Sequence, residues 1–293
     1  MSTPVVGELI DLLQLERLEE NLFRGQSRDI GTKYVFGGQV LGQALSAAQQ
    51  TVDPVRGAHS LHAYFLRAGD IEAPIVYTVE RTRDGGSFSV RRVVAIQHGE
   101  PIFNCSVSFQ VEQAGIEHAA PMPAVPRADD LPPRPPLPPE VVNKLPTKLQ
   151  RWFGRNAPFD MRYVEQPDFG KAQKREPRQH IWFRLAGRVT ESPATHRAIL
   201  AYASDFNLIT TALLPHGLSM IEHYGSLRMA SLDHGLWFHR PFRADEWLLY
   251  ACDSPTAQGA RALARGQVFD ADGRLVASTI QEGMIRLVEA GAT

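Results

Sequence analysis

The stretch His59–Asp70, with the sequence HSLHAYFLRAGD, decides the fold because its pattern returns in the second half of the chain. The second copy is His234–Glu246, with the sequence HGLWFHRPFRADE. After each copy come an apolar segment, a turn, an alternating Arg-rich segment, a second turn and a closing strand. These segments are Ile75–Val79 and Ser87–Ile96 in the first half, and Trp247–Cys252 and Arg261–Phe269 in the second. A period this long exceeds that of a solenoid and predicts one domain fused in two copies.

A long apolar segment precedes each copy, Val35–Ala48 in the first half and His196–Leu214 in the second. Both are apolar on nearly every face, so we expect two buried helices. Gly38 and Gly42 lie four residues apart, on one helix face, where they allow a strand or a ligand to approach closely. A helix followed by antiparallel strands in each copy predicts an α+β fold of two modules, each a sheet wrapped around a long helix.

The two copies are separated by a Pro-rich stretch. Ten of the 21 prolines lie between Pro121 and Pro146, which favours a semi-rigid extended connector over helix or central strand. The stretch could instead be a ligand for a proline-reading module. The expected division of the 293 residues is an N-terminal domain over 1–115, a linker over 116–151 and a C-terminal domain over 152–293.

The composition is that of a globular protein, with 43% hydrophobic and 22% charged residues. The formal net charge of -1 gives no electrostatic reason to expect nucleic acid or an anionic membrane as a partner. No apolar run approaches the ~18 residues that a membrane span needs.

The ends of the sequence carry no targeting pattern. The N-terminal segment predicts an acidic amphipathic helix rather than a signal peptide with a basic start. Its acidic residues are Glu8, Asp11, Glu16, Glu19 and Glu20. The C-terminal Ala290–Thr293 is neither a peroxisomal nor a retention signal, so we expect a cytoplasmic protein.

The two cysteines, Cys105 and Cys252, lie in apolar strand-like segments and have no metal-binding spacing. We expect both to behave as small hydrophobic residues, with a catalytic thiol as the alternative. The sequence also lacks a nucleophile elbow, a Walker loop, a dinucleotide fingerprint and a zinc-protease helix. The common serine-hydrolase and metallohydrolase mechanisms therefore have no support in it.

Asp205 interrupts an apolar stripe of the second predicted helix, where it shares a face with Ala201, Leu208 and Ala212. A carboxylate in such a place is costly unless it is hydrogen-bonded, and its pKa tends to rise. Two structural explanations stay open: the side chain ties down a neighbouring backbone amide, or it faces solvent. Asp205 is a candidate site residue.

Two predicted strands carry further polar side chains on inward faces. Alternation puts Ser231 on the same face as Met229, and Gln281 on the same face as Thr279. Each polar residue alone is a weak signal, but three inward-facing ones in a single half favour a site there. The place of Gln281 in the first half falls to Val107 or Ser108.

Several stretches make the chain similar, over most of its length, to the type II acyl-CoA thioesterases of the double hotdog family. They are Leu22–Gln26, Val35–Val40, His59–Arg67, Asp84–Phe88, Tyr202–Asp205, Asp233–Phe242 and Val276–Gly283. The resemblance implies two hotdog modules, hydrolysis of an acyl-CoA substrate without a cofactor, and further homo-oligomers of the whole chain.

The resemblance also implies a catalytic Asp, Thr and Gln that act through water without a covalent intermediate. Asp205 and Gln281 match the Asp and the Gln, whereas the Thr position is taken by Ser231. Serine keeps the hydroxyl but lacks the methyl group that restricts the rotamer of threonine.

Two other functions stay open. The segment Asp205–Leu208 resembles the D-x-N-P-x-H signature of hotdog hydratases and dehydratases, but the proline is replaced by Leu208 and the catalytic histidine by Thr210. The base for reversible hydration is therefore missing. The other alternative is a non-catalytic acyl-CoA binding protein, and release of free CoA separates hydrolysis from both.

Overall fold

The computed structural model describes residues 4–143, 145, 147, 150, 157–168, 171–223 and 225–288. The first half contains α1 (Pro4–Leu13), β1 (Glu16–Glu19), β2 (Leu22–Gly25), α2 (Gly37–Gln49), β3 (Arg56–Phe65), β4 (Ile75–Asp84), β5 (Phe88–Gln97) and β6 (Glu100–Val111). The connector contains η1 (Ala128–Asp130) and α3 (Pro139–Val142). The second half contains β7 (Phe159–Tyr163), β8 (Arg178–Leu185), α5 (Pro193–Ala203), η2 (Ile209–His216), β9 (Leu227–Ser231), β10 (Asp233–Phe238), β11 (Leu248–Gln258), β12 (Arg261–Asp270) and β13 (Leu275–Leu287).

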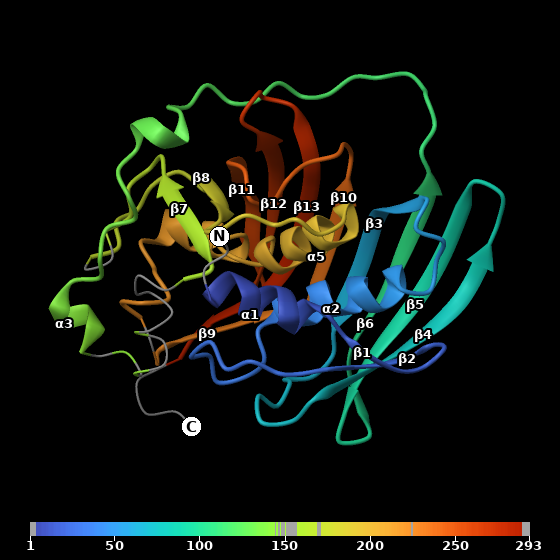
Figure 1. The fold of residues 1–293 in the computed structure, drawn as a ribbon. Coiled ribbons are helices and arrows are strands. Elements are labelled where there is room, and N and C mark those ends of the chain that lie inside the picture. The colour runs from blue at the N-terminus through green and yellow to red at the C-terminus, as the bar shows by residue number, and fades with distance from the viewer. Residues whose placement is uncertain are drawn as a thin grey trace.

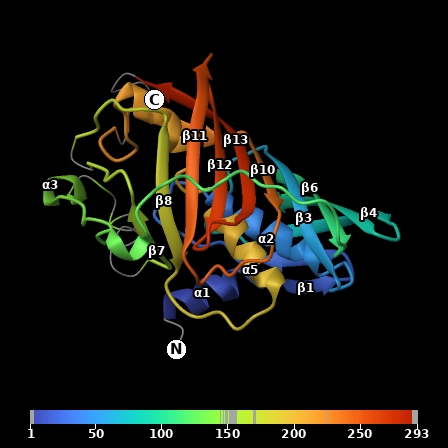
Figure 2. The ribbon, with the colours of Figure 1, turned by 90° about the horizontal axis from the view of Figure 1, so that it is seen from above.

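The described strands form one 13-stranded antiparallel sheet in the order β1-β2-β4-β5-β6-β3-β10-β13-β12-β11-β8-β7, and β9 pairs with β13. Strands of the first half fill one end of this order and strands of the second half the other. Figures 1 and 2 show α2 and α5 side by side on one face of the sheet. The predicted α+β fold, with an antiparallel sheet around a central helix in each half, is confirmed.

The repeat in the sequence becomes a local twofold arrangement in the sheet. Strands β3 and β10, which begin the two copies, pair antiparallel with Leu61 opposite Leu236. These two leucines occupy the same position in the repeated stretch. The two halves therefore join through equivalent strands, as the subunits of a symmetric dimer would.

The helices α2 and α5 approach each other at the two glycines of α2. A Cβ atom on Gly38 would lie 2.2 Å from the carbonyl oxygen of Tyr202, and one on Gly42 would lie 3.0 Å from that of Ala198. The glycines allow a close approach as predicted, but it is made by the backbone of the other half's helix and not by a strand or a ligand.

The second predicted helix, over 196–214, is wrong as a single element. Helix α5 ends at Ala203, and after a turn the chain continues as the 3-10 segment η2. Asn207 within this turn has a φ of 63°, a left-handed conformation that an α-helix cannot contain. Asp205 therefore lies just beyond α5 and not on a helical stripe.

The Pro-rich connector runs over the outer face of the second half's sheet (Figure 2). Its residues Met122, Val125 and Leu131 pack on a cluster that includes Trp182 and Phe269. The expectation that this stretch contains no helix is wrong, since η1 and the four-residue α3 lie in it. Pro139 begins α3, where its fixed φ and missing N–H are tolerated.

The N-terminal segment is helical only over α1, and Glu16 and Glu19 bound the strand β1. The acidic helix predicted through Glu20 is therefore too long. Residues 151–156, which contain the predicted domain boundary, and Ala290–Thr293 lie outside the described residues. No helix among the residues described is long and apolar enough to cross a membrane.

Candidate active site

The structure brings Asp205, Ser231 and Gln281 together. The amide nitrogen of Gln281 lies 2.7 Å from Oδ1 of Asp205 and 2.9 Å from Oγ of Ser231. The Ser231 hydroxyl lies 3.5 Å from the same carboxylate oxygen. Two strands and one turn, far apart in the sequence, thus place three polar side chains within hydrogen-bonding distance.

Strand pairing explains why Ser231 and Gln281 are neighbours. Strand β9 ends at Ser231, which lies opposite Gly283 of β13. Side chains two residues apart on a strand share a face, so Gln281 lies on the face of Gly283. The alternation on both strands was predicted correctly. Thr279 and Gln281 are buried while Ile280 between them is more exposed, and Met229 and Ser231 are less exposed than Ala230 between them.

The hydrogen bonds determine how the Gln281 amide is oriented. The carboxylate of Asp205 only accepts, so the NH₂ group of Gln281 must face it. Its two hydrogens are then given to Asp205 and Ser231. The amide oxygen Oε1 is buried and has no hydrogen-bond partner among the described residues, which leaves one acceptor available for a small donor such as water.

Burial raises the pKa of Asp205 above its ordinary value, and hydrogen bonds from Gln281, the Gly38 N–H and Ser231 oppose this rise. The Gly38 amide belongs to the first turn of α2, in the other half of the chain. A Cβ atom on the preceding Gly37 would lie 2.7 Å from Oδ2 of Asp205. The two glycines let the carboxylate lie against the α2 N-terminus, whose dipole favours the ionised form.

Aromatic side chains join the two halves beside this carboxylate. Phe36, just before α2, stacks on Phe206 with ring centroids 4.4 Å apart and meets Tyr202 edge-on at 5.2 Å. The candidate site therefore lies where the halves meet, and the prediction that confined it to the second half missed the contribution of Phe36–Gly38. The glycine pair at the start of a buried helix was the available signal.

The equivalent place in the first half has different residues. Thr51 is the second residue after α2, as Asp205 is the second after α5. Pairing with the neighbouring strands β5 and β12 sets Val107 opposite Arg91 as it sets Gln281 opposite Ala264, so in this register Val107 takes the place of Gln281.

Arg91 fills this first-half position with a charged side chain that is only 1% exposed. Its guanidinium group donates to the Thr51 hydroxyl at 2.9 Å and to the Thr51 carbonyl oxygen at 3.0 Å. It also pairs with Asp84 at 2.7 Å. With Thr51 and Val107 in the places of Asp205 and Gln281, the first half lacks the combination that the second half has.

The two cysteines do not add a reactive group to this site. Cys105 and Cys252 are buried and unpaired, and burial raises the pKa of both thiols, which disfavours the reactive thiolate. In the part of the chain that the structure describes, no cluster of His, Cys, Asp and Glu could hold a metal ion.

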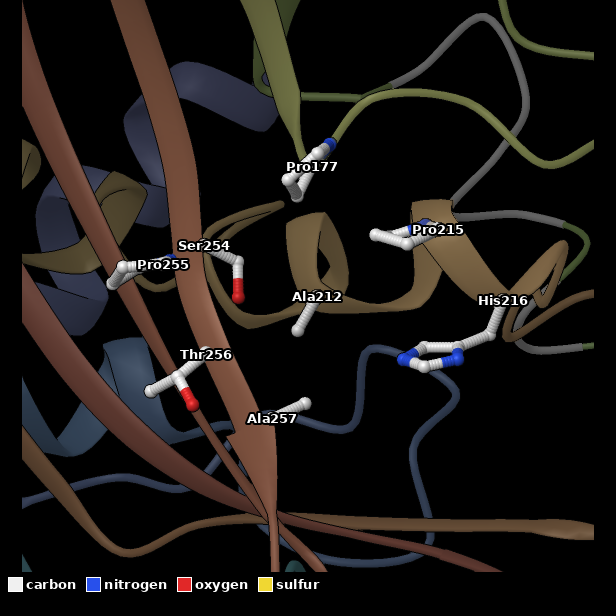
Figure 3. Close-up of a pocket in the computed structure, with 8 residues that line it drawn as sticks. All are labelled: Pro177, Ala212, Pro215, His216, Ser254, Pro255, Thr256 and Ala257. Carbon is white, nitrogen blue, oxygen red and sulfur yellow. The ribbon is translucent and has the colours of Figure 1, made fainter.

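A pocket lies between η2 and β11 (Figure 3), and none of the three residues lines it. It is lined by Pro177, Ala212, Pro215, His216, Ser254, Pro255, Thr256 and Ala257.

Comparison with known families supports one assignment for both halves. The sequence profile of the acyl-CoA thioesterase family matches residues 155–284, and that of the acyl-CoA thioesterase N-terminal domain matches residues 25–110. The chain is 42% identical to acyl-CoA thioesterase 2 of Haemophilus influenzae over 97% of this chain and 99% of that protein. It is 43% identical to human acyl-coenzyme A thioesterase 8, over 94% of this chain and 88% of that protein.

Solved structures agree with the fold. The acyl-CoA thioesterase II of Mycobacterium marinum is similar with a TM-score of 0.78 and 42% identity, over 96% of this chain and 99% of that chain. A hot dog fold protein from Alicyclobacillus acidocaldarius has a TM-score of 0.77 at 18% identity, over 96% of this chain and 99% of that chain. The second likeness concerns the fold alone.

Proposed function

The chain belongs to the acyl-CoA thioesterase family and is a thioester hydrolase, and we propose that a water molecule held by Asp205, Ser231 and Gln281 attacks the thioester directly. The observation that carries this proposal is the amide oxygen of Gln281, which lies beside a buried carboxylate and has no hydrogen-bond partner in the described part of the chain. A water bound there can donate one hydrogen to Asp205 and the other to Gln281. Its lone pair is then free to attack an acyl carbon.

In this scheme Asp205 is the general base. Burial raises its pKa, which makes the carboxylate a stronger base than an exposed aspartate. The hydrogen bonds from Gln281 and the Gly38 amide keep it oriented. Ser231 holds the water through Gln281: it accepts the second hydrogen of the Gln281 amide and so keeps the amide oxygen turned toward the water.

We further propose that the thioester carbonyl faces the N-terminal turn of α2. Negative charge develops on this oxygen when water attacks, and the positive end of a helix stabilises it. The bond between carbon and sulfur then breaks and CoA leaves as a thiolate. Because thiols have a pKa near ~8.5, the leaving group needs little protonation.

The hydratase alternative lacks its base in this geometry. Thr210, at the position of the hydratase histidine, donates its hydroxyl hydrogen to the Asn207 carbonyl oxygen at 2.9 Å. Incubation with acyl-CoAs of graded chain length, with CoA release and intact-protein mass spectrometry as readouts, tests the proposal. We expect free CoA, with no burst and no acyl adduct. A trapped acyl-enzyme would require a covalent mechanism.

Substitutions of Ser231 test whether its hydroxyl matters. Ser231→Ala removes the second acceptor for the Gln281 amide, and we expect kcat to fall by about tenfold. Ser231→Thr keeps the hydroxyl and restricts its rotamer, so this variant should retain most of kcat. The measurement is steady-state CoA release by both variants. An active Ala variant beside an inactive Thr variant would contradict the role given to the hydroxyl.

A further inference from the structure

Ser204, the residue before Asp205, is held by two elements of the sheet. Its backbone carbonyl oxygen accepts a hydrogen bond from the Tyr250 hydroxyl of β11 at 2.9 Å. Its side-chain hydroxyl lies 2.9 Å from Nε2 of His234 on β10. That carbonyl belongs to the peptide bond that links Ser204 to Asp205, so the contacts bear directly on how the carboxylate is placed.

The tyrosine is itself oriented by Thr279. The two hydroxyl oxygens lie 2.8 Å apart. Because a carbonyl only accepts, the single hydrogen of Tyr250 goes to Ser204, and Thr279 must donate to Tyr250. Thr279 lies two residues before Gln281 on the same face of β13. One chain of hydrogen bonds thus leads from the strand that carries Gln281 to the turn that carries Asp205.

The histidine contact has a fixed direction as well. Ser204 gives its hydroxyl hydrogen to the Ala201 carbonyl oxygen at 3.0 Å, so the Nε2–H of His234 must donate to Ser204. Burial lowers the pKa of His234 to about 3, which keeps the ring neutral. Ser204 is therefore held by its carbonyl and by its side chain at once.

A position without a side chain on strand β12 makes the tyrosine contact possible. Strand β12 lies between β11 and β13, and at Gly266 it has no side chain. A Cβ atom there would lie 2.2 Å from Cε2 of Tyr250 and 2.5 Å from the Thr279 hydroxyl oxygen. Because Gly266 has no side chain, the Tyr250 ring can lie across β12 and reach Thr279.

Building on the base role proposed for Asp205, we propose that Tyr250 is a positioning residue of the hydrolytic site and that Thr279 orients it. The phenol acts on no substrate atom. It holds the Ser204 carbonyl, and through this peptide bond it keeps the Asp205 carboxylate in line with Gln281 and the bound water. A displacement of about 1 Å at a catalytic group can lower a rate by about 100-fold.

The first half supplies a matched control. Tyr77 is the third residue of β4, as Tyr250 is the third residue of β11. The two side chains are 0% and 3% exposed. The Tyr77 hydroxyl donates to Gln43 of α2 at 2.7 Å, and Gln43 bonds onward to Leu12 and Gln26, away from the candidate site.

The experiment compares Tyr250→Phe with Tyr77→Phe in the full-length chain. Each removes one hydroxyl from an equally buried ring, so we expect similar losses of melting temperature. Only Tyr250→Phe should lower kcat for an acyl-CoA, by about tenfold or more, with KM changed by less than about twofold. Equal kcat values for the two variants would overturn the proposal.

Thr279 provides a second pair of variants. Thr279→Val keeps the shape but removes the donor, and kcat should fall as it does in Tyr250→Phe. Thr279→Ser keeps the donor and should restore most of kcat. The double variant Tyr250→Phe/Thr279→Val should be no slower than Tyr250→Phe alone, because both substitutions break one chain of contacts. A Thr279→Ser variant as slow as Thr279→Val would contradict the proposal. If Tyr250→Phe does not fold, the comparison of these two Thr279 variants tests the positioning role by itself.

Failure of the positioning role is distinguishable from failure of the proposed mechanism. A slow Asp205→Asn variant together with a fast Tyr250→Phe variant would overturn only the positioning role. An Asp205→Asn variant with the wild-type rate would overturn the mechanism itself.

Discussion

Asp205→Asn should lower kcat by about 100-fold or more and leave the fold intact. The amide has nearly the same shape as the carboxylate, but it cannot accept a proton from water. Gln281 and the Gly38 amide both donate to this side chain. In the asparagine variant an NH₂ group replaces one of the accepting oxygens and faces one of these donors. Steady-state CoA release measures the loss, and a thermal melt checks the fold. Wild-type turnover would contradict the assignment of Asp205 as the base.

The pH profile gives this prediction a second readout. A general base works only when it is ionised, so activity should be lost as pH falls through the pKa of Asp205. Because burial raises this pKa, the acid limb of kcat should lie above the ordinary carboxyl value. The residual activity of Asp205→Asn should lack this limb. A limb unchanged in the variant would assign the titration to another group.

The sequence was sufficient to predict the strands that follow the two copies and the side chains of β9 and β13 that face inward, but not β1, β7 or β8. Alternation has a fixed period of two, so it identified Ser231 and Gln281 without knowledge of their partners. Asp205 was selected for a reason that the structure does not support. Its apolar surroundings continue past the end of α5 into η2, and hydrophobic periodicity does not detect a break that depends on the left-handed Asn207.

Contacts between the halves could not be predicted from periodicity. The pairing of Leu61 with Leu236 and the approach of Gly38 to Asp205 depend on how two distant segments dock. The reason for a glycine at position 266 is visible only when β11 and β13 are placed beside β12, because Tyr250 and Thr279 fill the space of its missing side chain. Residues that act through such contacts, Tyr250 above all, resemble ordinary core residues in the sequence.

Neither half should be active or stably folded when it is expressed alone. We expect fragments 1–115 and 116–293 to aggregate, because each exposes an unpaired strand edge at β3 or β10 and the apolar side of α2 or α5. The second fragment keeps the connector, whose Met122 and Leu131 cover the sheet around Trp182. A fragment that starts near Trp152, at the boundary predicted from the sequence, would lose this cover as well.

Cleavage of the intact protein supplies the control for this last prediction. Residues 112–121 are exposed and have no assigned helix or strand, so a protease site inserted after Gly115 should be accessible. The cleaved chain should keep its activity, because the β3–β10 pairing and the α2–α5 contact hold the halves together without the covalent link. Size-exclusion chromatography and CoA release measure both properties. Separate fragments that are soluble, monomeric and without affinity for each other would show that the two halves are independent domains.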